Sequence, residues 1–591
     1  MSHSQGVIHA RLAQAYAHDH KTDKALAEAR LALEGLAPSD DEERALTWLA
    51  IAEAQYFDLA VTGSADSFGK ALESAAAAKS APLLRRAQVG LALCYVTVDP
   101  ARATQLLDTV LAAPEFASSP DIYRAQIYDV RGRATLNLGN AREAMPYLVK
   151  AVDLSGGMRG AQVNLVQVGI RGDAAIGALL IQHADEARLY LAWTGAGHLP
   201  SNDWISGLGD PPVCNEAAGV GPKEMAVVEF SINAAGRVTG AVPIYVSRPG
   251  TLGVTFAKAV RGWSWNPERI AALPAFWRNM VRIEMRCISH PNPRGLAAPF
   301  RAETIEWLSR SGLTAEDLAP DHTYVVRDDP RLEREDVAAV PALFARLQYE
   351  SDHGRSMLIA QHLTAALDQA HAPAAARALA MSLQPVDAKY FSGSAANVRM
   401  KADQLAALEH SDPKSAPTAW RTLEYAIALE GSGQFDQARP VLERVLAYPK
   451  DALGDNDPVR EVAILHLSAL QRRAGDIEGA EARIKAVGLT RAQCMLFDVR
   501  PVATDQFVSS KEFPDEALRW GFDGLVREAF DIDAAGHVQN VRTIIAYPPF
   551  VFRSAAEKTV AHFRYLAPVV EGGAAGCDGH SLNLSYRAVT H

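Results

Sequence analysis

The sequence of 591 residues lacks several features that would assign it to a familiar class. It has no apolar run long enough to cross a membrane: the uncharged stretch Ala87–Val98 has 12 residues, whereas a spanning helix needs roughly 20. It also lacks an excess of positive charge, since 59 Lys and Arg face 69 Asp and Glu, for a net charge of −10. Because phosphate binding needs a concentrated basic face, we expect no nucleic-acid partner.

Signatures of catalysis and of cofactor binding are missing as well. The sequence contains no P-loop, no dinucleotide-binding glycine pattern and no paired-histidine zinc motif. The pattern Ser67-x-x-Lys70 occurs in a helical segment without the companion motifs of an acyl-transfer enzyme. We therefore predict that the protein is not an enzyme, and we expect no catalytic residue, no metal site and no cofactor.

Cysteine is scarce: the chain has five, and no two are spaced as Cys-x-x-Cys. This argues against a zinc ribbon and against a thioredoxin-type site. Cys94 lies in an apolar helical run and is expected to be a buried, unreactive thiol.

The N-terminus, Met1-Ser2-His3-Ser4-Gln5, is not a basic region followed by an apolar one, so it does not read as a secretory signal. Helical periodicity begins almost at once, near Val7. Two interpretations stay open here: a cytoplasmic protein, or a mature chain whose signal sequence has been removed.

The sequence does contain a spacing of small and bulky residues that recurs in its helical segments, here called the cadence. A helix ends near a glycine or a short polar turn, a small alanine follows five residues later, and a bulky residue comes four positions after that. The cadence occurs in four segments: Val7–Pro38, Tyr123–Ser155, Trp420–Pro449 and Glu461–Leu489. It resembles the tetratricopeptide repeat, whose period is about 34 residues. The alternative is a generic antiparallel stack of helices without a peptide groove.

Two stretches, Met225–Ile288 and Leu525–Tyr586, change from the helical period to a period of 2, which is typical of strands. They are copies of each other, because Phe230–Val238 matches Phe530–Val538 at an offset of 530 − 230 = 300. Each copy predicts two strands joined by a tight turn, then a helix and a last strand. A glycine able to take positive φ ends each turn, at Gly236 and Gly536.

The second copy carries a combination of short motifs. They are Phe513-Pro514, Ala517-Leu518, Gly521 and Gly524, Asp533-Ala-Ala-Gly536-His-Val538, Pro548, and Phe563-Arg-Tyr565 with Pro568. Together they resemble the C-terminal domain of the energy transducer TonB over most of Phe513–Arg587. The first copy is similar but retains fewer of these motifs, namely Asn233–Val238 and Trp263-Ser-Trp265.

The resemblance implies a small domain whose last strand pairs with a segment of an outer-membrane transporter. An energy transducer of this type also carries an N-terminal membrane helix and a long Pro-rich spacer, and this sequence shows neither. The resemblance therefore implies the fold and a strand-pairing surface rather than energy transduction.

We predict a multidomain α and α+β protein, in which tetratricopeptide-like α-solenoid segments alternate with two small strand-strand-helix-strand domains like the TonB C-terminal domain. The predicted limits are 1–200 for the first helical array, 201–292 for the degenerate first domain, 293–492 for a linker and the second array, and 493–591 for the second domain.

In each copy one cysteine precedes the domain and one lies in or just before the last strand. The pairs are Cys214 with Cys287 and Cys494 with Cys577. The alternative is four buried thiols, but the matching placement favours two disulfides. Disulfides imply an oxidising compartment, in agreement with the periplasmic setting of TonB-like domains.

The last strand alternates: Leu582, Leu584 and Tyr586 point one way and Ser581, Asn583, Ser585 and Arg587 the other. We expect the apolar face to pack on the helix that carries Phe552, Ala556 and Val560. As an edge strand it would offer unpaired N–H and C=O groups to a partner strand. The alternative is an edge covered by Cys494–Asp505. The polar positions of the first copy's last strand, Arg282, Glu284 and Arg286, are predicted to serve in the same way.

These observations favour a non-enzymatic periplasmic adaptor that binds a protein or peptide through repeat grooves and edge-strand addition. An outer-membrane transporter or another envelope protein is the expected kind of partner. One alternative is a part of a TonB-type transport system whose membrane anchor lies outside this sequence. The other is a hydrolase with an interdomain site, which nothing in the sequence suggests.

Overall fold

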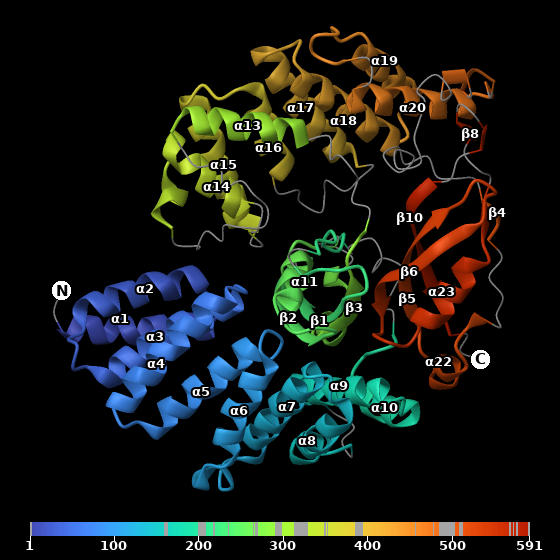
Figure 1. Ribbon diagram of the computed structural model, residues 1–591. Helices are drawn as coiled ribbons and strands as arrows, with labels where there is room; N and C mark the ends of the chain where they lie inside the picture. The colour runs from blue at the N-terminus through green and yellow to red at the C-terminus, as the bar shows by residue number, and fades with distance from the viewer. Residues whose placement is uncertain are drawn as a thin grey trace.

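The computed structural model shows helical arrays and small β units that alternate along the chain (Figure 1). The residues that the structure describes are 3–158, 163–198, 209–216, 219–234, 236–263, 265, 270–289, 298–312, 329–347, 350, 353–384, 394–454, 457–476, 478–480, 482–483, 503–506, 512–565, 569–570, 573–574 and 577–588. None of the helices in these ranges is long and apolar enough to cross a membrane.

The first array is a stack of helical hairpins in which each helix packs against the next. Its helices are α1 (His3–His18), α2 (Thr22–Gly35), α3 (Asp41–Phe57), α4 (Val61–Ala77), α5 (Ala81–Tyr95), α6 (Pro100–Leu111), α7 (Asp121–Asn137), α8 (Ala141–Leu154), α9 (Leu165–Leu180) and α10 (Ala184–Leu191). The second array packs in the same sequential way, except that its first helix packs against its fourth. It comprises α13 (Ala298–Arg310), α14 (Val340–Leu347), α15 (His353–Gln369), α16 (Ala374–Leu383), α17 (Ala395–Ser411), α18 (Ala416–Gly431), α19 (Phe435–Leu446) and α20 (Pro458–Arg473).

The hairpin turns confirm the predicted cadence and extend it. Gly139 and Gly433 have φ values of 83° and 79°, and the alanines five residues on, Ala144 and Ala438, are fully buried between the paired helices. The same left-handed turn recurs at non-glycine residues that the sequence pattern did not reveal, namely His20, Leu59, Gln182 and His371. Each is followed five residues later by a buried small residue: Ala25, Ser64, Ala187 and Ala376. The helical-repeat part of the predicted fold is therefore confirmed.

The first β unit consists of β1 (Met225–Ile232), β2 (Val238–Val246), α11 (Leu252–Arg261) and β3 (Val281–Arg286). The second contains β5 (Gly524–Ile532), β6 (Val538–Tyr547), α23 (Arg553–Ala561) and β10 (Cys577–Tyr586), preceded by the short helix α22 (Asp515–Trp520). The short strands β7 (Arg564–Tyr565), β8 (Val569–Val570) and β9 (Gly573–Ala574) lie between α23 and β10. The predicted order of strand, strand, helix and strand is thus confirmed for both copies. The likeness to the TonB domain itself stays a prediction.

The turn between the first two strands is the same in both units. Gly236 and Gly536 have φ values of 74° and 83°. Their carbonyls accept a hydrogen bond from the second aromatic of the aromatic-x-aromatic pair, Trp265 N at 2.8 Å and Tyr565 N at 2.9 Å. A side chain at residue 236 would be strained by its backbone, and its Cβ would lie 2.1 Å from the Trp265 carbonyl oxygen.

The two units join into one six-stranded sheet of order β10-β5-β6-β3-β1-β2. The joint is an antiparallel pairing of β3 with β6, in which Glu284 lies opposite Ala546 and Met285 opposite Ile545. Residues directly opposite each other point to the same face. Met285 and Ile545 belong to the core that α11 covers, whereas Ala546 belongs to the core of α9 and α23. The two unit helices therefore lie on opposite faces of the sheet.

The first β unit lies at the centre of the molecule, with the first array, the second array and the second unit arranged around it (Figure 1). Charged contacts connect the second array to the first: Arg355 forms an ion pair with Asp23, and Arg346 lies 4.0 Å from Asp58. Asp58 also lies 3.5 Å from Arg261 of α11. The first unit is thus enclosed, and the second unit is peripheral.

Candidate functional site

Strand β10 has the predicted alternation. Ser581, Asn583 and Ser585 are exposed, and Tyr586 is buried. The Tyr586 ring stacks on Phe552 with 4.9 Å between centroids. Leu582 and Leu584 are half-buried and pack against the core that contains Val560 of α23. The strand therefore packs its apolar face on α23, as predicted, and exposes a small polar face.

β10 stands at the end of the sheet. It pairs with β5 on one side, and among the residues that the structure describes no strand pairs with its other side. The alternative, coverage by Cys494–Asp505, concerns a segment of which Cys494 and most neighbours lie outside the described residues. Of that segment, Ala503–Asp505 form β4, which pairs with β7 (Arg564–Tyr565) instead of β10.

The prediction that Arg282, Glu284 and Arg286 lie on a free edge is wrong. Their strand, β3, is inside the sheet and is paired with β1 on one side and β6 on the other. Arg282 forms ion pairs with Glu229 and Asp173, both at 2.7 Å. The physical reason is that the second copy supplies a strand to this edge, which analysis of each copy on its own does not reveal.

The other two charges are also used inside the molecule. Arg286 lies 2.6 Å from Glu284, and the second carboxylate oxygen of Glu284 accepts a hydrogen bond from the Phe550 backbone N–H at 2.8 Å. Glu284 thereby holds the chain that follows β6 against β3. Its role is to secure the joint between the units.

The register shows which backbone groups of β10 face outward. In an antiparallel pair, residues alternate between those that bond to the neighbouring strand and those that face away. At β2, the Val246 N–H points away from β1 and the Ser247 N–H points toward it. The alternation can be followed from strand to strand. Ala226, opposite Val246, faces β3 and bonds to Met285, so the next residue, Glu284, faces β6 and bonds to Ala546. Val526, opposite Ala546, therefore faces β10, and its partner Leu584 faces β5.

It follows that Asn583 presents its backbone N–H and C=O to the open side of β10. The two units agree on this, because β1 pairs Val227 with Glu284 while β5 pairs Arg527 with Asn583. The last strands are thus related by an offset of 583 − 284 = 299. Asn583 is the counterpart of Glu284, whose backbone faces β6. The edge that β3 uses to bind a strand is therefore the edge that β10 leaves open among the described residues.

The opposite end of the sheet is closed by a side chain. Asn137, at the end of α7, is 2% exposed. Its amide Nδ2 donates to the Ile244 carbonyl at 3.0 Å, and its Oδ1 accepts from the Val246 N–H at 2.8 Å. One asparagine thus satisfies two outward backbone groups of β2, as a neighbouring strand would. The Gly250 N–H, just after β2, donates to the Thr97 carbonyl of the first array at 3.0 Å.

The face of β5 beneath α23 contains a buried acid, Glu528, whose side chain is fully shielded from solvent. Its Oε1 accepts a hydrogen bond from the Thr543 hydroxyl at 2.6 Å. Desolvation, with a smaller contribution from Glu557, raises the pKa of Glu528 to about 8. At the offset of 300 its counterpart is Val228, a core residue of the first unit.

The first of the two expected disulfides is present. Cys214 and Cys287 are bonded, with 4.9 Å between their Cα atoms, and the bond ties the segment before β1 to the end of β3. Cys94 is free and buried, as expected; burial raises its pKa to about 11, so the thiol is protonated. Cys494 and the side chain of Cys577 lie outside the described residues, and their pairing stays a prediction.

The sequence analysis missed Asn137 and the joint between β3 and β6. A polar side chain at the inward end of a repeat helix, two residues before the Gly139 turn, was a visible signal that this helix end contacts something polar. The joint had no comparable local signal, because neither β3 nor β6 carries a motif that names its partner.

Comparisons with known proteins add little to this geometry. No sequence model of a known family matches the chain, and no curated protein matches it. Solved structures that align over much of its length include the following two. The first, described as Naa15/Naa10 bound to HypK-THB, is 12% identical over 83% of this chain and 64% of its own, with a TM-score of 0.21. The chain thus spans less than two thirds of that structure.

The second, the APC/C hetero-tetramer Cut9-Hcn1, is 11% identical over 80% of this chain and 70% of its own, with a TM-score of 0.19. At these TM-scores neither likeness carries an argument about this protein. The case for its function therefore rests on the geometry of the sheet edges and the helical arrays.

Proposed function

We propose that the protein is a non-enzymatic adaptor that binds a protein partner by adding an extended strand of that partner to β10. The observation that carries the proposal is the joint between the units. The same edge that stays open at β10 binds a strand at β3, through the backbone of Glu284, the counterpart of Asn583. The molecule therefore contains an example of the pairing that we propose for the partner.

The chemistry of β10 suits strand addition. An unpaired edge offers a row of N–H and C=O groups that give affinity, while the side chains on either face select the sequence. On the α23 face the half-buried Leu582 and Leu584 would contact apolar side chains of the incoming strand. On the other face the exposed Ser581, Asn583 and Ser585 would contact polar ones. The partner segment should thus alternate apolar and polar residues and run antiparallel to β10.

We further propose that the protein works in an oxidising compartment, the periplasm in a Gram-negative type of cell. The Cys214–Cys287 disulfide supports this setting, because disulfides persist where thiols are not kept reduced. An extended segment of an envelope protein, such as an outer-membrane transporter, is then the kind of partner expected. The helical arrays would hold the sheet in place and offer a second contact surface.

The test is a capture experiment from envelope extracts with three forms of the full chain: wild type, Asn583→Pro and Asn583→Ala. Proline removes the outward N–H of residue 583, and an edge position tolerates it. Alanine keeps that N–H and removes the same side chain, including its 3.1 Å hydrogen bond from Arg527 Nε. We expect Asn583→Ala to capture the partner that wild type captures and Asn583→Pro to lose it.

A synthetic peptide with the β6 sequence, Val538–Tyr547, provides a direct probe, because β6 is the strand that pairs with the equivalent edge of β3. Its binding can be measured by fluorescence anisotropy with the same three proteins. If folded Asn583→Pro captures the partner as well as wild type does, binding at the β10 edge is refuted and the helical arrays become the binding surface.

A further inference from the structure

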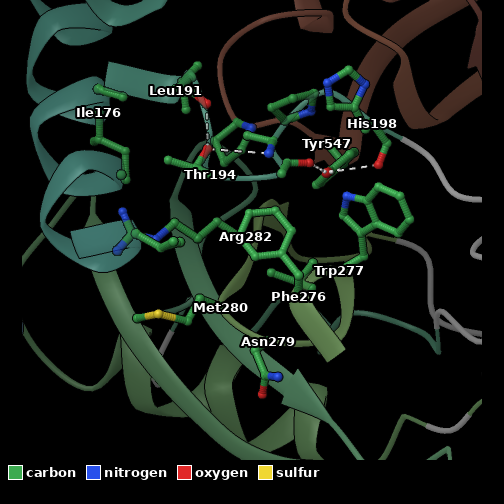
Figure 2. A pocket seen from close by; sticks show the side chains of 18 of the residues that line it. Ile176, Leu191, Thr194, His198, Phe276, Trp277, Asn279, Met280, Arg282 and Tyr547 are labelled. Atoms are coloured by element: carbon green, nitrogen blue, oxygen red, sulfur yellow. Dashed lines mark hydrogen bonds between the residues drawn. The ribbon is translucent and has the colours of Figure 1, made fainter. Parts of the chain in front are cut away.

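A cavity lies where three parts of the chain meet. Its walls come from α9 and the turn after α10, from the segment that runs from the short 3-10 helix Ala275–Arg278 into β3, and from the end of β6 at Tyr547 (Figure 2). The space inside it amounts to about 50 Å³, and the cavity opens to solvent at its mouth.

The lining is mostly apolar. Ile176, Leu179 and Leu191 form the wall on the side of the first array, and Phe276, Trp277 and Met280 form the opposite wall (Figure 2). Phe276 and Trp277 are only half-buried, so their rings are partly open to solvent. Such walls favour contact with an apolar or aromatic group.

The hydroxyl groups of Tyr547 and Thr194, which line the cavity, both donate to backbone carbonyls. The Tyr547 hydroxyl donates to the Gly195 carbonyl at 3.1 Å, and the Thr194 hydroxyl donates to the Leu191 carbonyl at 2.7 Å. Burial raises the pKa of Tyr547, so this phenol is neutral at physiological pH. The cavity thus offers no hydroxyl that would gain a partner from a polar ligand.

The positive charge at the cavity is neutralised as well. Arg282 forms its ion pairs with Asp173 and Glu229 and donates to the Gly169 carbonyl at 3.0 Å. An anionic ligand would have to compete with the carboxylates of Asp173 and Glu229 for this guanidinium. The chemistry therefore selects against charged ligands.

The backbone is specialised at the cavity walls. Gly195 has φ 80°, and a Cβ there would lie 3.0 Å from the Phe276 ring and 3.2 Å from the Trp277 ring. Only glycine lets the turn after α10 approach these two rings. Met280 has φ 55°, an uncommon conformation for a long side chain. Strained backbone of this kind is found at ligand sites more than elsewhere.

We propose that this cavity is a binding site for an uncharged small molecule, which inserts one aromatic or aliphatic group between these walls. Water gains few hydrogen bonds in an apolar cavity, so displacement of water by an apolar ligand is favourable. Because the walls belong to the first array and to both β units, a bound ligand would also hold these three parts together. The proposal does not depend on strand addition at β10.

The uncharged dye N-phenyl-1-naphthylamine is a suitable probe, since its fluorescence rises and shifts to the blue in an apolar site. Trp277→Ala removes one aromatic wall, and Leu179→Trp fills space from the opposite side. Trp193→Ala is the matched control: Trp193 is 61% exposed and is not among the described residues that line the cavity. Circular dichroism establishes that each variant is folded.

We expect saturable dye binding to wild type that raises its melting temperature. Trp277→Ala should bind about tenfold more weakly or worse, because it loses a ring contact, Leu179→Trp should not bind, and Trp193→Ala should bind like wild type. The proposal fails if wild type shows no saturable binding, or if Trp193→Ala loses as much affinity as Trp277→Ala. It also fails if folded Trp277→Ala binds as tightly as wild type, an outcome that can be read even where Leu179→Trp does not fold.

Discussion

The two β units share a strand order, a turn and a helix position, but their surroundings differ. In the first unit both outer strands are covered, β3 by β6 and β2 by the first array through Asn137. In the second unit only β6 is covered, and among the described residues β10 has one neighbour. A duplicated unit thus has one copy enclosed as scaffold and one copy with an edge available for pairing.

This difference shows how two units can share one sheet without further strand pairing between separate molecules. Each unit offers its last strand on one side and its second strand on the other, and the joint pairs the last strand of one with the second strand of the next. Such a contact is heterologous and could continue indefinitely between chains. Asn137 and α7 occupy β2, so the intact first unit cannot serve as the next partner of β10.

The units also differ inside their cores. Val228 lies beneath α11, and its counterpart Glu528 lies beneath α23. The enclosed unit keeps an apolar residue there, while the peripheral unit buries a carboxyl that desolvation keeps protonated at neutral pH.

The largest expected effect comes from cutting the crosslink of the first unit. The variant Cys214→Ala with Cys287→Ala opens a loop with a sequence separation of 73, which the chain-entropy model values at about 4 kcal/mol of unfolding free energy. Urea unfolding measures this loss. Mass spectrometry of the non-reduced protein shows whether Cys494 and Cys577 form the corresponding bond in the second unit. If a reductant leaves the urea unfolding of wild type unchanged, the predicted stabilisation is contradicted for both units.

The next largest effect is expected from removing the Asn137 side chain, which covers the outer edge of β2. Asn137→Ala leaves the Ile244 carbonyl and the Val246 N–H without their partner, at a cost of about 3 kcal/mol, since each buried unpaired group costs about 1–3 kcal/mol. Asn140→Ala, an exposed asparagine at the next helix start with no capping hydrogen bond, is the control and should change little. Equal stability of Asn137→Ala and wild type would mean that the edge is closed by the helix alone.

The smallest effect concerns Glu528. Its pKa is raised from 4.5 to about 8, so between these values the folded protein holds a proton that the unfolded chain has released. Unfolding then releases that proton, and stability is highest at low pH and falls as pH rises through this window. Between about pH 5 and about pH 7 the Glu528 contribution should fall by about 2 kcal/mol. The variant Glu528→Val places the residue of the first unit at this position and should lose this pH dependence. The urea midpoints of both proteins, measured across a pH series, test this expectation. Identical pH profiles for the variant and wild type would refute the prediction.

Much of this architecture could be predicted from local patterns. The offset between Phe230 and Phe530, the turns at Gly236 and Gly536, and the alternation of Leu582, Leu584 and Tyr586 all depend on residues close in sequence, and each matches an observed element. The Cys214–Cys287 pairing followed from the repeated placement of cysteines. Hairpin turns at Leu59 and His371 escaped notice because a helix can end in left-handed geometry without a glycine.

The sequence by itself determined the list of parts: helical hairpins, two strand-strand-helix-strand units, a first disulfide and an amphipathic last strand. Only the tertiary structure decided which edges are closed. Glu284 and Asn583 occupy equivalent positions, yet one backbone bonds to β6 and the other faces outward. The reason is that strand pairing uses backbone groups common to every residue, so the partner of an edge is chosen by what the rest of the chain brings beside it.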